Sequence, residues 1–232
     1  MDQGVCLVYE SPGVQRVTGE TIRPGGLALT RRAVTLAGLQ AGDRVLDVGC
    51  GLGATVNFLA ERGLHAVGID LSATLLRQGS RQFPQRLLTQ GRGEMLPFAT
   101  GRFDALLAEC CLSLMPSPAQ ALAEFSRVLR VGGTLILSDM VTRSPDSAPG
   151  EAEPRTCCIS GAFYRPHLEA LLAEAGFELA WWEDQTEALK QLAVQIIWEY
   201  GSLAGFWSCA GQADKAVTRT KPGYVLLLAA RR

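Results

Sequence analysis

Apolar and polar positions along residues 44–139 alternate between short β-branched runs and longer amphipathic windows. The runs predict strands and the windows predict helices, at the spacing of βα units in a parallel sheet. Ser72 is a preferred residue at a helix N-cap, and Gly132-Gly133 is expected to end the helix before the fifth strand. The predicted elements are strands Val45–Val48, His65–Asp70, Leu87–Thr89, Phe103–Ala108 and Thr134–Ser138, with helices Ala54–Glu61, 73–82 and Pro118–Arg130.

Beyond residue 164 the pattern predicts a helix, a strand, a longer helix and a last strand, at Arg165–Ala175, Phe177–Trp182, Gln185–Tyr200 and Tyr224–Ala229. We therefore expect a single doubly wound α/β domain with a mostly parallel, seven-stranded sheet and a helical insertion before the last strand.

The domain is expected to span residues 1–232, with a helical N-terminal cap over 1–43 and a cofactor-binding core over 44–139. Ligands of such sheets lie beyond the carboxyl ends of the strands. The segments 140–164 and 185–223 are therefore expected to form the walls of a substrate site. The long helix within the second segment is either a lid over that site or a core or dimer face.

Composition narrows the class of protein. The 232 residues are 47% hydrophobic with a formal net charge of −1, which is typical of one soluble globular domain. Since there is no basic run, nucleic acid is not an expected partner. The apolar windows are shorter than the roughly 20 residues of a membrane span, and the N-terminus lacks a signal-peptide pattern. We expect a cytoplasmic monomer or homodimer whose seven cysteines are reduced.

A glycine cluster, Gly49-Cys50-Gly51-Leu52-Gly53, stands between the first predicted strand and its helix. Glycines permit a tight turn and let a ligand lie against bare backbone, close to the free N–H groups of the helix start. Asp70 ends the second strand, 19 residues after Gly51, where a carboxylate can accept hydrogen bonds from both ribose hydroxyls. The arrangement predicts an adenosine-containing cofactor; the alternative is a glycine-rich turn without a ligand.

Asp47 precedes the first glycine by two residues. The glycines also satisfy the dinucleotide fingerprint, so NAD is one candidate cofactor. A carboxylate at this position would repel a pyrophosphate, but it would attract a cofactor end that carries an ammonium and a sulfonium. Asp47 therefore favours S-adenosylmethionine; its other possible role is to cap the turn through backbone N–H groups.

Five motifs in order resemble the class I S-adenosylmethionine-dependent methyltransferases, a Rossmann-like family. They are Asp47-Val48-Gly49-Cys50-Gly51-Leu52-Gly53, Gly68-Ile69-Asp70-Leu71-Ser72, Gly91 with Leu96-Pro97-Phe98, Phe103-Asp104, and Arg127-Val128-Leu129-Arg130-Val131-Gly132-Gly133. The resemblance implies that Gly49, Cys50 and Gly51 hold the methionine moiety. It also implies that Asp70 binds the ribose, that Leu71 packs on adenine and that Glu109 binds the ammonium.

The chain departs from this family ahead of Leu96, where Arg92 replaces the aspartate that binds the adenine amino group. Arginine has no acceptor, so three alternatives remain: backbone at Gly93–Met95, the side chain of Glu94, or packing alone. Arg23 is a candidate partner for the carboxylate of the cofactor, and the alternative is a solvated arginine.

Methyl transfer is an in-line displacement that needs positioning and exclusion of water, and oxygen or nitrogen acceptors usually also need a base. Of the two histidines, His65 lies at the wrong end of the sheet, and His167 opens a helix after the loop. Glu109 and Asp139 end strands at the ligand edge, so they are candidates for orienting the acceptor or taking its proton. Either could instead be a capped loop acid.

Cys158 and the residues after it, Cys158-Ile159-Ser160-Gly161-Ala162-Phe163-Tyr164, resemble a segment of arsenite methyltransferases whose cysteine binds trivalent arsenic. The resemblance implies that Cys158 binds a thiophilic acceptor, with Cys209 as a second thiolate. Cys110 and Cys111 are expected mainly to pack. No ligand spacing indicates a metal site.

The prediction is a methyltransferase for a small molecule; its rivals are a non-catalytic protein that binds S-adenosylmethionine or S-adenosylhomocysteine, and an NAD-dependent oxidoreductase.

Overall fold

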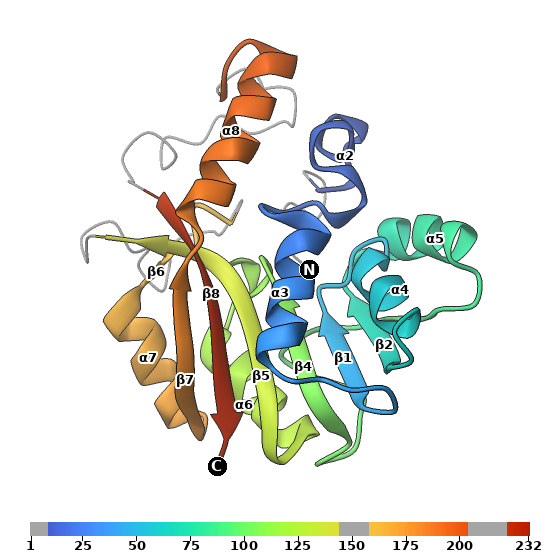
Figure 1. Ribbon diagram of the computed structural model, residues 1–232, viewed down its shortest axis with the longest axis vertical. Helices are drawn as coiled ribbons and strands as arrows, with labels where there is room; N and C mark the ends of the chain where they lie inside the picture. Colours follow the sequence, from blue (N-terminus) through green and yellow to red (C-terminus); the bar gives the residue numbers. More distant parts are fainter. Residues whose placement is uncertain (1–8, 144–157, 204–221) are drawn as a thin grey trace.

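The computed structural model, which describes residues 9–143, 158–203 and 222–232, is built on a mixed sheet of eight strands (Figure 1). Seven strands follow the order β3-β2-β1-β4-β5-β8-β7, and the two-residue strand β6 pairs with β5. The strands are β1 (Arg44–Val48), β2 (His65–Asp70), β3 (Leu87–Gln90), β4 (Phe103–Glu109), β5 (Leu129–Thr142), β6 (Phe163–Tyr164), β7 (Phe177–Asp184) and β8 (Pro222–Arg231).

Strand direction gives the sheet its doubly wound character. The pairs β1–β2, β1–β4, β2–β3 and β4–β5 are parallel, whereas β8 runs antiparallel to both β5 and β7. The chain winds outward from β1 in both directions, so the strand order reverses beside β1 and β4, where ligands bind in such sheets. The predicted fold class is confirmed, and all seven predicted strands are present.

Helices cover both faces of the sheet (Figure 1). One face packs against α6 and α7 through a core that includes Phe125 and Leu172, and the other packs against α3 and α4 through Leu29 and Phe58. Because both faces are covered, the central strands are almost continuously apolar. The helices are α2 (Pro12–Thr18), the 3₁₀ turn η1 (Gly19–Thr21), α3 (Gly26–Leu36), α4 (Ala54–Ala60), α5 (Ala73–Gln82), the 3₁₀ turn η2 (Leu112–Leu114), α6 (Pro118–Val128), α7 (Arg165–Glu174) and α8 (Thr186–Tyr200).

Two helix ends were predicted from the sequence, and the structure has one of them. The predicted cap is present, because the hydroxyl of Ser72 accepts a hydrogen bond from the amide of Leu75 at 3.0 Å. The prediction that Gly132-Gly133 ends α6 is wrong: the helix ends at Val128. Leu129 is already extended, since it is fully buried and pairs with Phe103 of β4, and Gly132 makes a left-handed bend inside β5.

Helix α8 lies with α2 beyond the carboxyl edge of the parallel strands (Figure 1). Its Leu192, Ile196 and Tyr200 form a small core with Val14 of α2, and Leu189 packs toward the sheet. The apolar stripe of α8 therefore covers the N-terminal segment of the same chain.

Across the described ranges, no helix combines the length and hydropathy that crossing a membrane requires.

Candidate active site

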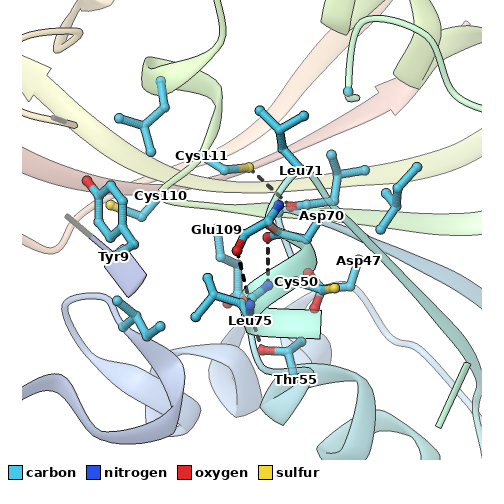
Figure 2. A pocket seen from close by; sticks show the side chains of 18 of the residues that line it. Tyr9, Asp47, Cys50, Thr55, Asp70, Leu71, Leu75, Glu109, Cys110 and Cys111 are labelled. Atoms are coloured by element: carbon cyan, nitrogen blue, oxygen red, sulfur yellow. Dashed lines mark hydrogen bonds between the residues drawn. The ribbon is translucent and has the colours of Figure 1, made fainter. Parts of the chain in front are cut away.

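A cavity of about 290 Å³ opens at the carboxyl ends of β1, β2 and β4 (Figure 2). Its floor is the turn after β1, and the N-terminal segment around Tyr9 and 20–23 forms another wall. Segments far apart in the sequence thus meet at one edge of the sheet. The lining includes ten of the predicted site residues: Arg23, Asp47, Gly49, Cys50, Gly51, Asp70, Leu71, Gly93, Glu94 and Glu109.

The glycine turn is held tightly against its neighbours. The amides of Gly49 and Cys50 both donate to the carbonyl of Ile69, at 2.8 and 3.1 Å. Gly49 has φ 72°, and a Cβ there would lie 2.6 Å from Cβ of Cys111. Only glycine combines this backbone with so close an approach. The turn is therefore pre-formed between β2 and the loop after β4.

Asp70 is partly buried and joins the two halves of this floor. Its Oδ2 accepts from the amide of Gly51 at 2.8 Å, and its Oδ1 accepts from the amide of Ser72 at 2.7 Å. Burial raises the pKa of Asp70, against the effect of these two N–H donors. The carboxylate is thus oriented before any ligand binds, while Leu71 beside it stays 41% exposed on the cavity wall.

Asp47 is 2% exposed, and its Oδ2 has no hydrogen-bond partner among the described residues. Burial raises the pKa of Asp47 well above its usual value, the charge of Glu109 raises it further, and Arg23 opposes both. An unpaired buried acceptor costs about 1–3 kcal/mol, so a cationic or hydrogen-bonding group brought by a ligand would find a favourable partner here. Oδ2 makes none of the backbone contacts that a cap of the turn requires.

A buried ion pair joins the N-terminal segment to the end of β4. Nη2 of Arg23 lies 2.7 Å from Oε2 of Glu109, and both side chains are almost fully buried. The hydroxyls of Thr30 and Thr55 donate to the two oxygens of Glu109 at 2.9 and 3.0 Å. Arg23 is therefore not a solvated arginine, although its Nε is buried without a partner among the described residues. Burial acts to lower the pKa of Arg23, but the acidic groups of Glu109, Tyr224 and Asp47 together with the hydrogen bond to Glu109 raise it above its usual value.

Sequence reasoning missed Thr30 and Thr55. Thr30 stands 79 residues before Glu109, within an amphipathic helix, and Thr55 is the second residue of α4. Neither position has a distinctive local pattern. Only the packing of α3 and α4 on the same face brings the two hydroxyls to one carboxylate.

The segment after β3 places Gly93 and Glu94 at the cavity but not Met95, whose side chain is 72% exposed and outside the lining. Arg92 also lines the cavity, with its Nε 3.8 Å from Oε2 of Glu94. Oε1 of Glu94 is buried and has no partner among the described residues. Among the three alternatives for holding adenine, the Oε1 atom of Glu94 is therefore available as an acceptor. The side chain of Met95 does not contribute to the cavity wall.

Asp139 lies outside the cavity lining. It is fully buried and accepts from the amide of Ser113 at 2.9 Å and from the amide of Met140 at 2.7 Å. Burial raises the pKa of Asp139 to about 6, against these donors. Asp139 therefore binds backbone amides of the loop after β4, which is the alternative that the sequence analysis left open to a catalytic role. His65 and His167 are exposed and outside the lining as well.

The cysteines divide into three groups. Cys50, Cys110 and Cys111 are buried in the cavity wall, and the thiol of Cys111 donates to the carbonyl of Val48 at 3.1 Å. Cys158 is outside the cavity lining but contacts Cys110 and Tyr9, which Figure 2 shows at the side of the cavity opposite Asp47. Cys209, the predicted second thiolate, lies outside the described residues, as do Cys6 and Cys157.

Among the residues described, no cluster of three or more His, Cys, Asp or Glu side chains could hold a metal ion.

Known proteins resemble this chain in sequence. Residues 46–137 match the family model described as a methyltransferase domain. A demethylmenaquinone methyltransferase of Beutenbergia cavernae is 35% identical over 137 residues, which are 59% of this chain and 56% of that protein. An arsenite methyltransferase of Halobacterium salinarum is 30% identical over 153 residues, 61% of this chain and 39% of that protein. The chain spans about half the length of the first curated relatives it matches.

Solved structures resemble it over nearly the whole chain. The [4+2]-cyclase SpnF superposes with a TM-score of 0.79 at 23% identity, covering 98% of this chain and 95% of that one. Phosphoethanolamine N-methyltransferase 2 of Haemonchus contortus, in complex with S-adenosyl-L-methionine, gives 0.75 at 16% identity, covering 97% and 56%. At these identities the likeness concerns the fold.

Fold and cavity together define a Rossmann-like α/β protein with a ligand site at the carboxyl edge of its sheet. Within that class, residues 46–137 match the methyltransferase domain model, and this stretch contains all five sequence motifs, which confirms their resemblance to that family.

Proposed function

We propose that the protein is an S-adenosylmethionine-dependent methyltransferase that acts on a small molecule. The observation that carries this proposal is the buried, unpaired Oδ2 of Asp47 beside the glycine turn. A pyrophosphate at this turn would meet a carboxylate at close range, whereas an ammonium or sulfonium would be attracted. This electrostatic difference favours S-adenosylmethionine over NAD.

The remaining contacts suit the other parts of this cofactor. Asp70 would accept from the ribose hydroxyls, Leu71 would pack on adenine, and Arg23 would face the carboxylate. When bound, S-adenosylmethionine supplies a methyl group on a sulfonium as the electrophile. The chain's part is to hold both reactants in line and to exclude water, which the wall formed by Tyr9 and residues 20–23 supports.

The described cavity favours an acceptor that needs little help from a base. Glu109 is the strongest candidate base, but both its oxygens are engaged by Arg23, Thr30 and Thr55. No histidine stands among the described lining residues. Glu109 would therefore orient groups rather than accept a proton. A soft nucleophile with a free lone pair fits such a site better than an alcohol.

A thiol or a thiol-bound trivalent metalloid is the acceptor class that one further observation favours. Cys110 is in the cavity wall, and Cys158 contacts it from the loop after β5. Soft thiolates suit thiophilic metalloids, and one relative is named an arsenite methyltransferase. The rival with most support is a non-catalytic protein that binds S-adenosylmethionine, since both oxygens of Glu109 are engaged and Arg92 stands where the family has its adenine-binding aspartate.

Calorimetric titration with S-adenosylhomocysteine tests the cofactor. We expect binding by the unchanged chain, a loss of about 10- to 100-fold in affinity for Asp70→Ala, and a change below about twofold for Asp43→Ala, a control at the opposite end of β1. No binding by the unchanged chain, or equal binding by Asp70→Ala, contradicts the proposal. NAD binding that exceeds S-adenosylhomocysteine binding contradicts it too.

Transfer from cofactor labelled in the methyl group then separates enzyme from binding protein. With arsenite and a small thiol as acceptors, we expect labelled product from the unchanged chain and its loss in Cys158→Ser. Cys111→Ser is the matched control and should retain activity. Binding of S-adenosylhomocysteine without labelled product from any acceptor tested would favour the non-catalytic rival.

A further inference from the structure

Two thiols from distant parts of the chain meet at one end of the cavity. The side chains of Cys110, just after β4, and Cys158, in the loop after β5, are hydrogen-bonded to each other. The amide of Cys158 also donates to the hydroxyl of Tyr9 at 3.2 Å. Figure 2 shows the Tyr9 ring beside Cys110 on the cavity wall. Cys110 belongs to the core on the α3 face of the sheet, and the partly buried Cys158 packs against that core.

The two loops that carry these thiols are locked together. A Cβ on Gly161 would collide with the carbonyl oxygen of Ser113, so the loop after β5 packs directly on the backbone that follows Cys110. Ser113 is in turn held by Asp139 through its amide at 2.9 Å and its hydroxyl at 2.5 Å. Packing of the two loops on each other therefore helps to hold the thiols in contact.

The two thiols differ in environment. Cys110 is buried and its backbone is in the left-handed region, with φ 58°, whereas Cys158 is partly exposed. The hydrogen bond from Cys110 lowers the pKa of Cys158, more than burial raises it, and Tyr9 adds to the lowering. The same bond raises the pKa of Cys110 well above its usual value. Such inequality suits one attacking and one resolving thiol.

We propose that Cys110 and Cys158 are a reversible oxidation site, which hydrogen peroxide converts to a disulfide bridging the loops after β4 and β5. The sulfur of Cys158 attacks one oxygen of the peroxide, the O–O bond breaks, and the released hydroxide leaves as water, so that Cys158 becomes a sulfenic acid. The sulfur of Cys110 then displaces the sulfenic hydroxyl, which leaves with the thiol proton as a second water. In sum, two thiols and one peroxide give one disulfide and two waters.

Oxidation changes the acceptor end of the cavity and leaves the cofactor end intact. Cys110 lines the cavity, so its conversion to a disulfide removes a thiol from that wall. Asp70 and Gly51 make their contacts with each other and with β2, on elements that the bridge does not join. We therefore expect the oxidised chain to bind S-adenosylhomocysteine with an affinity within about twofold of the reduced chain. The disulfide itself does not depend on the proposed methyl transfer.

The test uses the full chain, reduced and then treated with a small excess of hydrogen peroxide. Intact mass should fall by two hydrogens, and peptide mapping should find Cys110 joined to Cys158. Dithiothreitol should restore the reduced mass. Cys110→Ser and Cys158→Ser should each lose the bridge, while Cys111→Ser and Cys157→Ser should keep it. Circular dichroism of each variant shows whether it is folded.

Several results overturn the proposal. These are no loss of mass in the unchanged chain, a bridge that uses Cys111 or Cys157 in place of either partner, and oxidation of Cys158 past the sulfenic acid with Cys110 still reduced. Mapping the unchanged chain distinguishes these results even if a variant does not fold. If the disulfide forms but S-adenosylhomocysteine binds to neither redox state, the proposed function fails and the oxidation site stands.

Discussion

The cofactor end of the cavity, around Gly51 and Asp70, is held by backbone hydrogen bonds within two consecutive βα units. The other end, around Tyr9, Cys110 and Cys158, is held by side chains from segments more than 40 residues apart. The first arrangement follows from strand, turn and helix in sequence order. The second depends on three loops packing correctly at once. Single substitutions should therefore change the stability or the reactivity of one end while leaving the other end unchanged.

The largest effect is expected at the ion pair that links the two ends. Glu109→Ala leaves Arg23 buried without its partner, and removing one member of a buried pair costs about 3–5 kcal/mol. Glu187→Ala, which removes an exposed pair with Lys190, should change the free energy of unfolding by less than about 0.5 kcal/mol. Urea denaturation measures both. Equal, small losses would show that Arg23 is not held by Glu109.

The next effect concerns pH, because burial raises the pKa of Asp139 to about 6. The folded chain then binds this proton more tightly than the unfolded chain, so Asp139 costs stability as pH rises from about 4 to about 6. The cost amounts to about 3 kcal/mol. Asp139→Asn cannot titrate, so its free energy of unfolding should gain by that amount over the unchanged chain across this range and then level off. Parallel pH profiles would contradict the buried, titrating carboxyl.

A smaller effect is expected from a substitution that disturbs only the loop packing around Cys110 and Cys158. Gly161→Ala places a methyl group against the carbonyl of Ser113, and such overpacking typically costs about 1–3 kcal/mol. The loops should move apart, and the yield of the Cys110–Cys158 disulfide should fall severalfold. Gly201→Ala, whose methyl group meets no atom within 4 Å, costs only its left-handed backbone, about 1 kcal/mol, and should keep the disulfide. Equal disulfide yields would show that Gly161 does not hold Cys158 in place.

The smallest effect sharpens the cofactor end. If Glu94 accepts the adenine amino group, Glu94→Gln should weaken binding of S-adenosylhomocysteine by about 3- to 10-fold, because the glutamine oxygen still accepts but the acceptor loses its charge. Met95→Ala, on an exposed side chain, should change it by less than about twofold. An analogue of S-adenosylhomocysteine with oxygen in place of the adenine amino group should bind the unchanged chain less tightly than S-adenosylhomocysteine does. The difference in affinity between the two ligands should be smaller for Glu94→Gln. Undiminished binding by Glu94→Gln would leave adenine to the backbone and to packing.

Sequence alone predicted most residues at the proposed cofactor end of the cavity and few of the contacts at the other end. The strands, Ser72 as a cap and the positions of Asp47 and Asp70 follow from periodicity and from short-range chemistry. Asp139 was a catalytic candidate because the predicted fifth strand ends beside it, but β5 continues to Thr142 and the side chain of Asp139 accepts from Ser113 instead. Met95, a candidate through its backbone, lies outside the cavity lining, although Gly93 and Glu94 of the same segment line it.

The doubly wound sheet and the glycine turn with its two acids were predictable from the sequence, because they depend on residues a few positions apart. The pairing of Arg23 with Glu109, the hydroxyls of Thr30 and Thr55 on the same carboxylate, and the contact of Cys110 with Cys158 emerged only in the folded chain. These contacts join distant segments that meet because helices and loops pack on a common sheet. No local periodicity records them.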